Sequence, residues 1–238
     1  MIYVTSDLHG YCFEKFLDFL KDTGFSDKDY LYILGDVIDR GKDGIKYLKW
    51  LMLQSNVFFI MGNHEAMMLS CDFLCNEITE ESINDFDEKK VSIYTTWLSS
   101  GGQATVNALA KEDKDTVCDI FDFLRETPLY EIVSIGEKDF ILTHSGLGSF
   151  REDKKLREYT PTDLLWSRPS LNRKYFENIT TVFGHTPTFC YGEQYRGKPL
   201  FTDTWINIDA GAAAGIDPVI LRLDDMKVFY MSCSANTD

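Results

Sequence analysis

The sequence predicts an α/β fold, a two-sheet β-sandwich flanked by helices, and three patterns lead to this prediction. Short apolar runs with β-propensity recur along the chain, and each of the first five leads into a polar, often glycine-containing loop. Helix-length segments with apolar residues at helical spacing separate the first of these runs. More short β-type runs lie near the C-terminus, where they indicate a second sheet.

The N-terminal segments follow one another in the order of a parallel sheet. We expect strands at residues 2–4, 30–34 and 57–61, with helices at 13–21 and 44–54 between them. Alternation of strand and helix at this spacing is typical of right-handed crossovers. In such sheets the loops at the carboxyl ends of the strands form the ligand site.

The later part of the chain is more varied. Apolar runs at 140–142 and 181–183 also lead into polar loops. The stretch of about 66–130 is mostly helical in pattern and more charged, so we expect a helical insertion that borders the site. Three C-terminal runs predict strands of a second, antiparallel sheet: 205–208, 219–223 and 227–231.

Length and composition are typical of a globular protein. The 238 residues can bury a substantial core and show no repeat or linker-like tract, so we expect a single domain over residues 1–238. The apolar runs are too short to span a bilayer, and the N-terminal residues lack a signal-peptide pattern, so we expect a cytoplasmic protein. A net charge of −14 argues against nucleic-acid or anionic-membrane partners.

The six cysteines do not form a metal-ligand pattern. Cys71 and Cys75 could share a helix face, but no second pair offers the remaining ligands of a thiolate zinc site. We therefore expect reduced and mostly buried thiols.

Polar residues of metal-ligand type follow each of the five strands that lead into loops. A single Asp or His in such a position is more often a turn or capping residue. The combination is more specific, because the loops at the carboxyl ends of strands that share one sheet edge meet in one place. The residues concerned are Asp7, His9, Asp36, Asp39, Asn63, His64, His144 and His185.

These side chains predict divalent metal ions. Carboxylates packed into one cleft would raise each other's pKa unless cations offset their charge. Carboxylate, imidazole and amide ligands without a thiolate suit manganese, iron or zinc. Two ions about 3.5–4 Å apart would neutralise a phosphate ester and supply a hydroxide nucleophile. All four histidines of the chain belong to this predicted site, and spacing alone leaves open which one is catalytic.

Two arginines are candidates for binding the phosphate. Arg40 follows Asp39 directly and could bind phosphate oxygens through two N–H groups, although a surface ion pair is the simpler role. Arg168, in the segment Trp166-Ser167-Arg168, is the second candidate.

Taken in order, the motifs resemble the signature of the phosphoprotein phosphatase (PPP) class of Ser/Thr phosphatases. The small size and the segments Trp97-Leu98-x-x-Gly101-Gly102 and Trp166-Ser167-Arg168 resemble its compact bacterial and phage branch, of the lambda-phosphatase type. The resemblance spans nearly the whole chain and implies a calcineurin-like metallophosphoesterase fold. The motifs that carry it are Asp7-x-His9, Gly35-Asp36-x-x-Asp39-Arg40-Gly41, Gly62-Asn63-His64-Glu65, Thr143-His144-Ser145-Gly146 and Gly184-His185-Thr186-Pro187.

The resemblance assigns metal ligands by position. It implies two divalent ions as cofactors, with Mn²⁺ expected and iron or zinc as the alternatives. Asp36 would bridge both ions, and Asp7 and His9 would bind the first. The second ion would be completed by Asn63, His144 and His185.

The resemblance also assigns the chemistry. His64 would be the general acid that protonates the leaving oxygen, and Asp39 would hold it in orientation. Arg40 and Arg168 would bind the phosphate. The reaction would be a single-step hydrolysis by direct attack of a hydroxide held between the two metals.

The implied substrate is a phosphorylated protein or peptide. The alternative is a phosphorylated nucleotide, because symmetrical diadenosine tetraphosphate hydrolases of bacteria use nearly the same site. The pair Asp39-Arg40, Glu65 after His64 and the absence of a segment long enough for a two-adenosine pocket favour the protein phosphatase. A non-enzymatic binding module is a third interpretation, but it predicts missing ligands, and none is missing.

Overall fold

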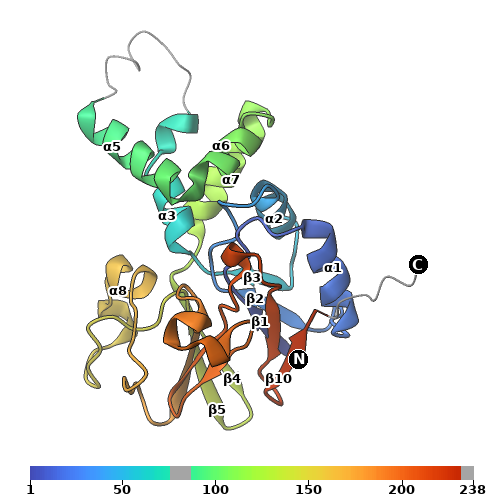
Figure 1. Ribbon diagram of the computed structural model, residues 1–238, viewed down its shortest axis with the longest axis vertical. Helices are drawn as coiled ribbons and strands as arrows, with labels where there is room; N and C mark the ends of the chain where they lie inside the picture. Colours follow the sequence, from blue (N-terminus) through green and yellow to red (C-terminus); the bar gives the residue numbers. More distant parts are fainter. Residues whose placement is uncertain (76–86, 232–238) are drawn as a thin grey trace.

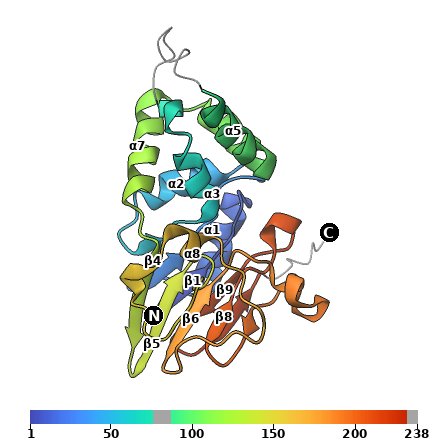
Figure 2. The same cartoon turned by 90° about the vertical axis from the view of Figure 1, so that its left-hand side faces the viewer.

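Two five-stranded sheets form the centre of the molecule in a computed structural model that describes residues 1–75 and 87–231. The first sheet has the strand order β10-β9-β1-β2-β3 and the second β4-β5-β6-β8-β7. Helices α1 and α2 lie beside the first sheet, whereas α5, α6 and α7 stand together beyond one end of the strands (Figures 1 and 2). The predicted sandwich with flanking helices is confirmed.

The first sheet is built from the N-terminal strands and helices, as the sequence predicts. β1, β2 and β3 are parallel, and β9 and β10 continue the sheet in antiparallel order. Phe16 and Leu20 of α1 and Leu48 of α2 are buried, which explains their helical spacing. The bounds are β1 (Ile2–Thr5), α1 (Phe13–Asp22), β2 (Tyr30–Ile33), α2 (Gly44–Leu51), β3 (Val57–Phe59), β9 (Val219–Arg222) and β10 (Lys227–Tyr230).

The second sheet is mixed. Its three central strands β5, β6 and β8 are parallel to one another, and β4 and β7 pair with them in antiparallel order at the two edges. The bounds are β4 (Tyr130–Ile135), β5 (Lys138–Thr143), β6 (Ile179–Phe183), β7 (Leu200–Phe201) and β8 (Trp205–Asn207).

The expectation that the three C-terminal runs form one antiparallel sheet is wrong. β8 lies parallel to β6 in the second sheet, whereas β9 and β10 extend the first. A short apolar run has the same appearance in either sheet, because its pairing partner is chosen by long-range packing. Leu221 of β9 pairs with Val4 of β1, and Ile206 of β8 faces the same core from the other sheet.

The core between the sheets is made of their facing side chains. Val4 of β1 and Leu34, directly after β2, pack with Phe140, Leu142 and Val182 from the second sheet, and all are fully buried. Burial of such side chains contributes about 1.5–3 kcal/mol each. This core fixes the two sheets relative to each other and therefore fixes the loops at their ends.

Several described helices lie between β3 and β4 in the sequence. The helix α7 buries an apolar stripe that includes Ile120, Phe121 and Leu124, and Asp113 caps its first turn by accepting the Thr116 N–H. The described elements are α3 (Asn63–Leu69), η1 (Asp72–Cys75), α5 (Glu88–Trp97), η2 (Leu98–Gly102), α6 (Gln103–Leu109) and α7 (Lys114–Glu126).

Short helices occupy the loops of the second sheet. α8 starts with a capping box, in which the Thr160 hydroxyl accepts the Asp163 N–H and the Asp163 carboxylate accepts the Thr160 N–H. The bounds are η3 (Leu156–Glu158), α8 (Pro161–Leu165), η4 (Thr188–Tyr191), η5 (Glu193–Tyr195) and η6 (Ala212–Ala214).

Two expectations from composition have different outcomes. Across residues 1–75 and 87–231, no helix is both long enough and apolar enough to cross a bilayer. Cys71 and Cys190 are free thiols. Among the cysteine side chains that the structure describes, only Cys71 is buried. The expectation of mostly buried thiols is therefore wrong.

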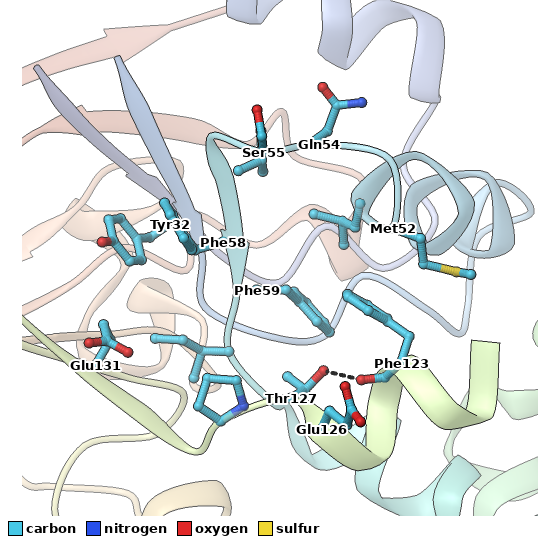
Figure 3. A pocket seen from close by; sticks show the side chains of 14 residues that line it. Tyr32, Met52, Gln54, Ser55, Phe58, Phe59, Phe123, Glu126, Thr127 and Glu131 are labelled. Carbon is cyan, nitrogen blue, oxygen red and sulfur yellow. Dashed lines mark hydrogen bonds between the residues drawn. The ribbon is translucent and has the colours of Figure 1, made fainter. Parts of the chain in front are cut away.

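A hollow of roughly 340 Å³ lies along the outer edge of the first sheet (Figure 3). Phe58 and Phe59 of β3 border it together with Phe123 of α7, and Glu126 and Glu131 lie at its rim. None of the predicted site residues lines it, so this hollow is separate from the predicted site.

Candidate active site

The polar loops of both sheets meet at one end of the sandwich. The His185 N–H, after β6, donates to the Asp7 carboxylate, after β1, over 2.9 Å. His144, after β5, donates from Nδ1 to the Leu34 carbonyl, after β2, over 2.8 Å. These loops were expected at the edge of one shared sheet; instead they come from the edges of two sheets.

The backbone at these loops is strained. Six of the eight non-glycine residues with positive φ in the described part of the chain belong to the predicted site. Such conformations cost about 1–3 kcal/mol each and persist only where the surroundings enforce them. The six residues are Asp7, His9, Asp36, Asp39, Arg40 and His185.

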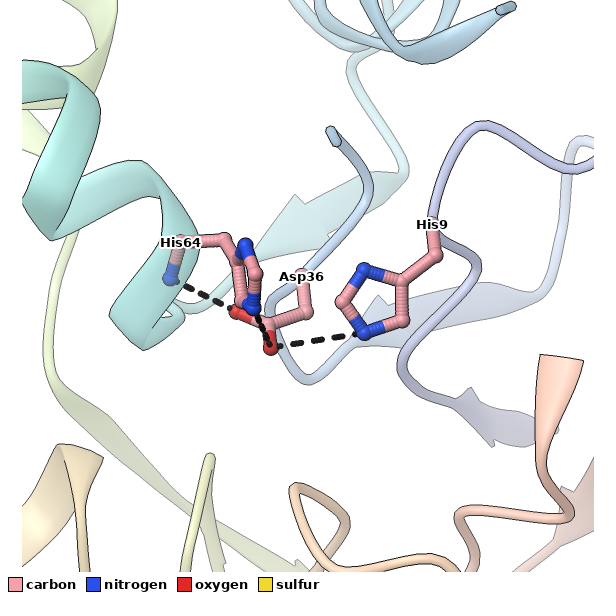
Figure 4. A group of neighbouring side chains, drawn as sticks. All are labelled: His9, Asp36 and His64. Carbon is pink, nitrogen blue, oxygen red and sulfur yellow. Dashed lines mark hydrogen bonds and ion pairs between the residues drawn. The ribbon is translucent and has the colours of Figure 1, made fainter. Parts of the chain in front are cut away.

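The Asp36 carboxylate lies at the centre of the cluster. Its Oδ2 atom is 3.7 Å from Nε2 of His9, 3.5 Å from Nε2 of His144 and 3.9 Å from Nε2 of His64. Figure 4 shows His9 reaching Asp36 from the loop after β1 and His64 reaching it from the start of α3. Two groups of possible metal-binding atoms share this carboxylate: His9, Asp36 and His64 in one, and Asp36, His144 and His185 in the other, each with its atoms within 4.8 Å of one another.

The histidines are oriented as metal ligands usually are. Nδ1 of His9 lies 3.1 Å from the Ile38 carbonyl and Nδ1 of His144 lies 2.8 Å from the Leu34 carbonyl. An accepting carbonyl requires Nδ1 to carry the proton, which leaves each Nε2 lone pair facing Asp36. Metal-bound histidines are commonly held by such a hydrogen bond from the other ring nitrogen.

Asn63 brings further acceptors together. Its Oδ1 atom is 2.8 Å from Nε2 of His144 and 2.8 Å from Nδ1 of His185, and these two nitrogens are 3.2 Å apart. Since the His144 proton resides on Nδ1, its Nε2 and Asn63 Oδ1 face each other as two acceptors. A cation between these atoms would satisfy them, so this side of the site fits a metal ion.

Asp7 lies behind the cluster and is almost wholly buried. Its Oδ2 atom accepts the His185 N–H, while Oδ1 has no hydrogen-bond partner among the described residues. A buried carboxylate oxygen without a partner is costly, so Asp7 also fits a cation-binding role. It is not a member of either close group of metal-binding atoms described above.

Electrostatics follow from burial. Burial raises the pKa of Asp7 and, with the Glu65 and Asp7 carboxylates nearby, raises that of Asp36 well above its usual range. Burial also lowers the pKa of His9, and with the neighbouring His144 it lowers that of His185 to about 2. Imidazoles that stay neutral beside carboxylates that are hard to ionise form a site that divalent cations would stabilise.

His64 differs from the other histidines. Its Nδ1 lies 2.6 Å from the Asp39 Oδ2 atom, so a carboxylate and not a carbonyl orients the ring. Burial would lower the pKa of His64, but the Asp36 and Asp39 carboxylates outweigh it and raise the pKa above its usual value. A protonated imidazole with Nε2 facing the cluster is equipped to donate a proton.

Arg40 and Arg168 both reach the cavity of roughly 220 Å³ at the site. The Arg40 guanidinium lies 3.2 Å from Nε2 of His9 and 3.3 Å from Nε2 of His64. Arg168 donates to the Thr186 hydroxyl over 3.0 Å. The cavity is lined by His9, Asp36, Arg40, Asn63, His64, Met67, Ser100, Trp166, Arg168 and His185.

Glu65 ties two of the loops together. Its carboxylate is fully buried and accepts the N–H groups of Asp36, Val37 and Ile38 as well as that of Gly62. The loop after β2 and the start of α3 are thereby held by one side chain. This explains why an acidic residue follows His64.

Sequence reasoning missed three residues that contact or adjoin the site. Asp209 lies two residues after β8 and is buried; its burial and the Asp7 carboxylate raise its pKa well above the usual range. The rule that polar residues follow strands would have found it. Trp97 and Thr105 donate to Asp39 from 58 and 66 residues away, and no local pattern predicts those contacts.

The arrangement combines three chemical functions. It offers acceptors for cations around Asp36, two guanidinium groups beside a small cavity and an imidazole that can hold a proton. Hydrolysis of a phosphate ester needs charge neutralisation, anion binding and protonation of a leaving alcohol. All ten predicted site residues are brought together here.

Comparison with known proteins gives relatives of two kinds. Serine/threonine-protein phosphatase 2 of Salmonella typhimurium is 27% identical over 89% of this chain and 87% of its own length. A symmetrical bis(5'-nucleosyl)-tetraphosphatase of Buchnera aphidicola is 39% identical, but over only 36% of this chain and 31% of that protein. One from Nitrosospira multiformis is 25% identical over 98% of this chain and 96% of its own length.

Solved structures support the same fold. A putative diadenosine tetraphosphatase superposes with a TM-score of 0.63 over 96% of this chain and 91% of its own, at 16% identity. A model of the calcineurin-like phosphoesterase family matches residues 1–210. The chain therefore belongs to the calcineurin-like phosphoesterase family.

Proposed function

We propose that the chain is a two-metal phosphomonoester hydrolase whose substrates are proteins phosphorylated on serine or threonine. The size of the site carries the choice of substrate. A cavity of roughly 220 Å³ has room for a phosphoryl group and the first atoms of its leaving group. It is smaller than the roughly 300–1,000 Å³ of pockets that enclose a whole small molecule, so the rest of the substrate would lie outside it.

The metal-binding residues follow from the donor atoms. Asp36 would be shared by two ions, with His9 and Asp7 on one side and Asn63, His144 and His185 on the other. When bound, the ions would neutralise phosphate charge and supply an activated water. We expect Mn²⁺, with iron or zinc as the alternatives, because each suits mixed carboxylate and imidazole ligands.

The other residues act on the phosphate and the leaving group. Arg40 and Arg168 would bind the phosphate oxygens through their N–H groups. His64 would give the proton on Nε2 to the leaving oxygen, and Asp39 would stabilise the charged ring in this orientation. Each step uses a group that already faces or adjoins the cavity.

A dinucleotide substrate is the second candidate. Its specific support is the symmetrical tetraphosphatase of Nitrosospira multiformis, which aligns over nearly its whole length. The half-exposed Trp166 at the edge of the cavity offers a ring on which a base could stack.

The two candidates can be separated by kcat/KM on two substrates. Protein loaded with Mn²⁺ is given a phosphothreonine peptide and, separately, diadenosine tetraphosphate, with a chelator-treated sample as the control. The phosphatase proposal predicts a kcat/KM at least about tenfold higher for the peptide, or about 1.4 kcal/mol of transition-state stabilisation. A preference of that size for the dinucleotide would replace the proposal with the second candidate.

Two broader expectations stay predictions. The first is that residues 1–238 form a single domain with a helical insertion at about 66–130. The second is that the protein is cytoplasmic.

A further inference from the structure

The turn between helices α5 and α6 packs against Asp39 and Arg40, and Asp39 is the partner of the proposed proton donor His64. Trp97 is the last residue of α5, and residues Leu98–Gly102 form a wide helical turn. Thr105 lies in the first turn of α6. Trp97 and Thr105 are both buried, whereas Ser100 lines the site cavity. Wide turns of this kind inside helices occur frequently at functional sites.

Both oxygens of the Asp39 carboxylate accept hydrogen bonds from the two residues that flank this turn. The Trp97 indole N–H donates to Oδ2 over 2.8 Å, the oxygen that also receives Nδ1 of His64. The Thr105 hydroxyl donates to Oδ1 over 2.6 Å. A carboxylate with a donor on each oxygen cannot rotate without breaking a buried hydrogen bond, so the His64 ring is held as well.

The same turn supports the backbone of Asp39 and Arg40, which have φ values of 68° and 65°. The Asp39 N–H donates to the Thr105 hydroxyl over 2.9 Å, and the Arg40 N–H donates to the Gly101 carbonyl over 3.0 Å. A side chain at Gly101, which has a φ of 110°, would place Cβ 2.6 Å from Cγ of Arg40. The approach is therefore too close for any other residue.

We propose that Trp97 and Thr105 are positioning residues for proton transfer. They fix Asp39, and through it they fix the direction in which His64 presents Nε2 to the leaving oxygen. The proposal rests on the proposed function, and specifically on His64 as the proton donor. It gives the helical segment a part in the chemical step, because two of its side chains determine the geometry of the donor.

The dependence of rate on the leaving group tests this role. A leaving group that departs as a stable anion needs little help from an acid, whereas a basic one needs a proton. The variants Trp97→Phe and Thr105→Val remove one donor each and keep much of the side-chain volume. Their kcat is measured with Mn²⁺ on 2,4-dinitrophenyl, 4-nitrophenyl and phenyl phosphate, which have successively more basic leaving groups.

We expect the defect to grow along the series. Relative to the unmodified protein, kcat falls less than about 3-fold on 2,4-dinitrophenyl phosphate and about 10- to 100-fold on phenyl phosphate, part of the effect of a complete general acid. Thr105→Ser, which keeps the hydroxyl, restores the shallow dependence. Thr95→Val makes the same chemical change at an exposed position of α5 and changes neither value.

Other outcomes overturn the proposal. An equal fall on all three esters would mean that Trp97 and Thr105 only support the fold or metal binding. The same conclusion follows if Thr105→Ser is as impaired as Thr105→Val. If Trp97→Phe does not fold, which its thermal unfolding reveals, the comparison of Thr105→Val with Thr105→Ser decides.

His64→Asn in the same series separates this proposal from the one on which it rests. If that variant shows the steep dependence and the Trp97 and Thr105 variants do not, His64 is the proton donor but the positioning role is wrong. If His64→Asn falls equally on all esters, the donor assignment itself fails. If the unmodified metal-loaded protein hydrolyses none of the esters, the proposed function itself is wrong, and the positioning role is wrong with it.

Discussion

Among single residues, His64 differs from the other histidines in the group that orients its ring. His9 and His144 each donate Nδ1–H to a backbone carbonyl, whereas His64 pairs with the Asp39 carboxylate. We expect His64→Asn to lower kcat by roughly 10²–10⁴-fold. Bound Mn²⁺, measured by elemental analysis, should remain unchanged; loss of metal would mean that His64 is a ligand and not the acid.

Glu65 gives a prediction about stability at the same scale. Its carboxylate accepts four backbone N–H groups while fully buried. Glu65→Gln replaces one accepting oxygen with a donor and leaves N–H groups unpaired, at about 1–3 kcal/mol each. We expect the free energy of unfolding to fall by about 2–4 kcal/mol in urea titrations. The exposed Glu126→Gln should change it by less than about 0.5 kcal/mol, and equal effects of the two variants would contradict the account.

At the scale of elements, α8 leads the chain toward Arg168, and its capping box sets where that segment begins. The Asp163 carboxylate accepts the Thr160 N–H over 3.0 Å and pairs with Lys154 over 3.0 Å. Burial would raise the pKa of Asp163, but the Thr160 N–H and the Lys154 ammonium outweigh it and lower the pKa to about 2. A lowered carboxyl pKa means that the stabilisation is complete above the ordinary value of 3.8 and is lost as pH falls toward 2.

Asp163→Asn should therefore destabilise the fold in a pH-dependent way. We expect a loss of about 1 kcal/mol near pH 7, the usual effect of a helix cap. The difference from the unmodified protein should shrink between about pH 4 and pH 2, measured by urea unfolding at each pH. Asp153→Asn, an exposed neighbour, is the control. A difference that stayed constant down to pH 2 would show that the charge of Asp163 is not responsible.

The elements also show how far the sequence could lead. Strands β1, β2, β3, β5 and β6 were predictable because each apolar run ends in a polar loop, and the same rule located the ligand-type residues. The sheet to which β8 or β9 belongs was not predictable, since both are short apolar runs whose partners lie far away in sequence. The contacts of Trp97 and Thr105 with Asp39 could not be predicted for the same reason, because they depend on how α5 and α6 pack against the loop that carries Asp39.

At the scale of the whole molecule, the inter-sheet core brings together carboxylates that burial makes hard to ionise. Asp7, Asp36 and Asp209 are all buried, and burial raises the pKa of each. Such a site weakens the fold until cations bind, a common compromise at functional sites. The loops of two sheets must therefore be held by packing elsewhere, mainly by the side chains between the sheets.

Metal binding should accordingly stabilise the whole fold. We expect Mn²⁺ at about 100 times its dissociation constant to add about 2.7 kcal/mol, seen as a higher Tm than in chelator-treated protein. Asp36→Asn removes the charge shared by both groups of donor atoms, so it should abolish this increase. It should also raise the Tm of the metal-free protein, because a neutral amide suffers less from burial. An unchanged Tm on adding Mn²⁺ would contradict a metal site in this cluster.

Phosphate release as a function of bound metal is the most direct test of the two-metal site. Chelator-treated protein is titrated with Mn²⁺, and both the bound equivalents and the rate on a phosphothreonine peptide are recorded at each step. Because two groups of donor atoms share Asp36, we expect activity to be absent without metal and to reach its maximum at two bound ions per chain. Full activity at one ion, or activity that persists in the chelated protein, would contradict the two-metal account.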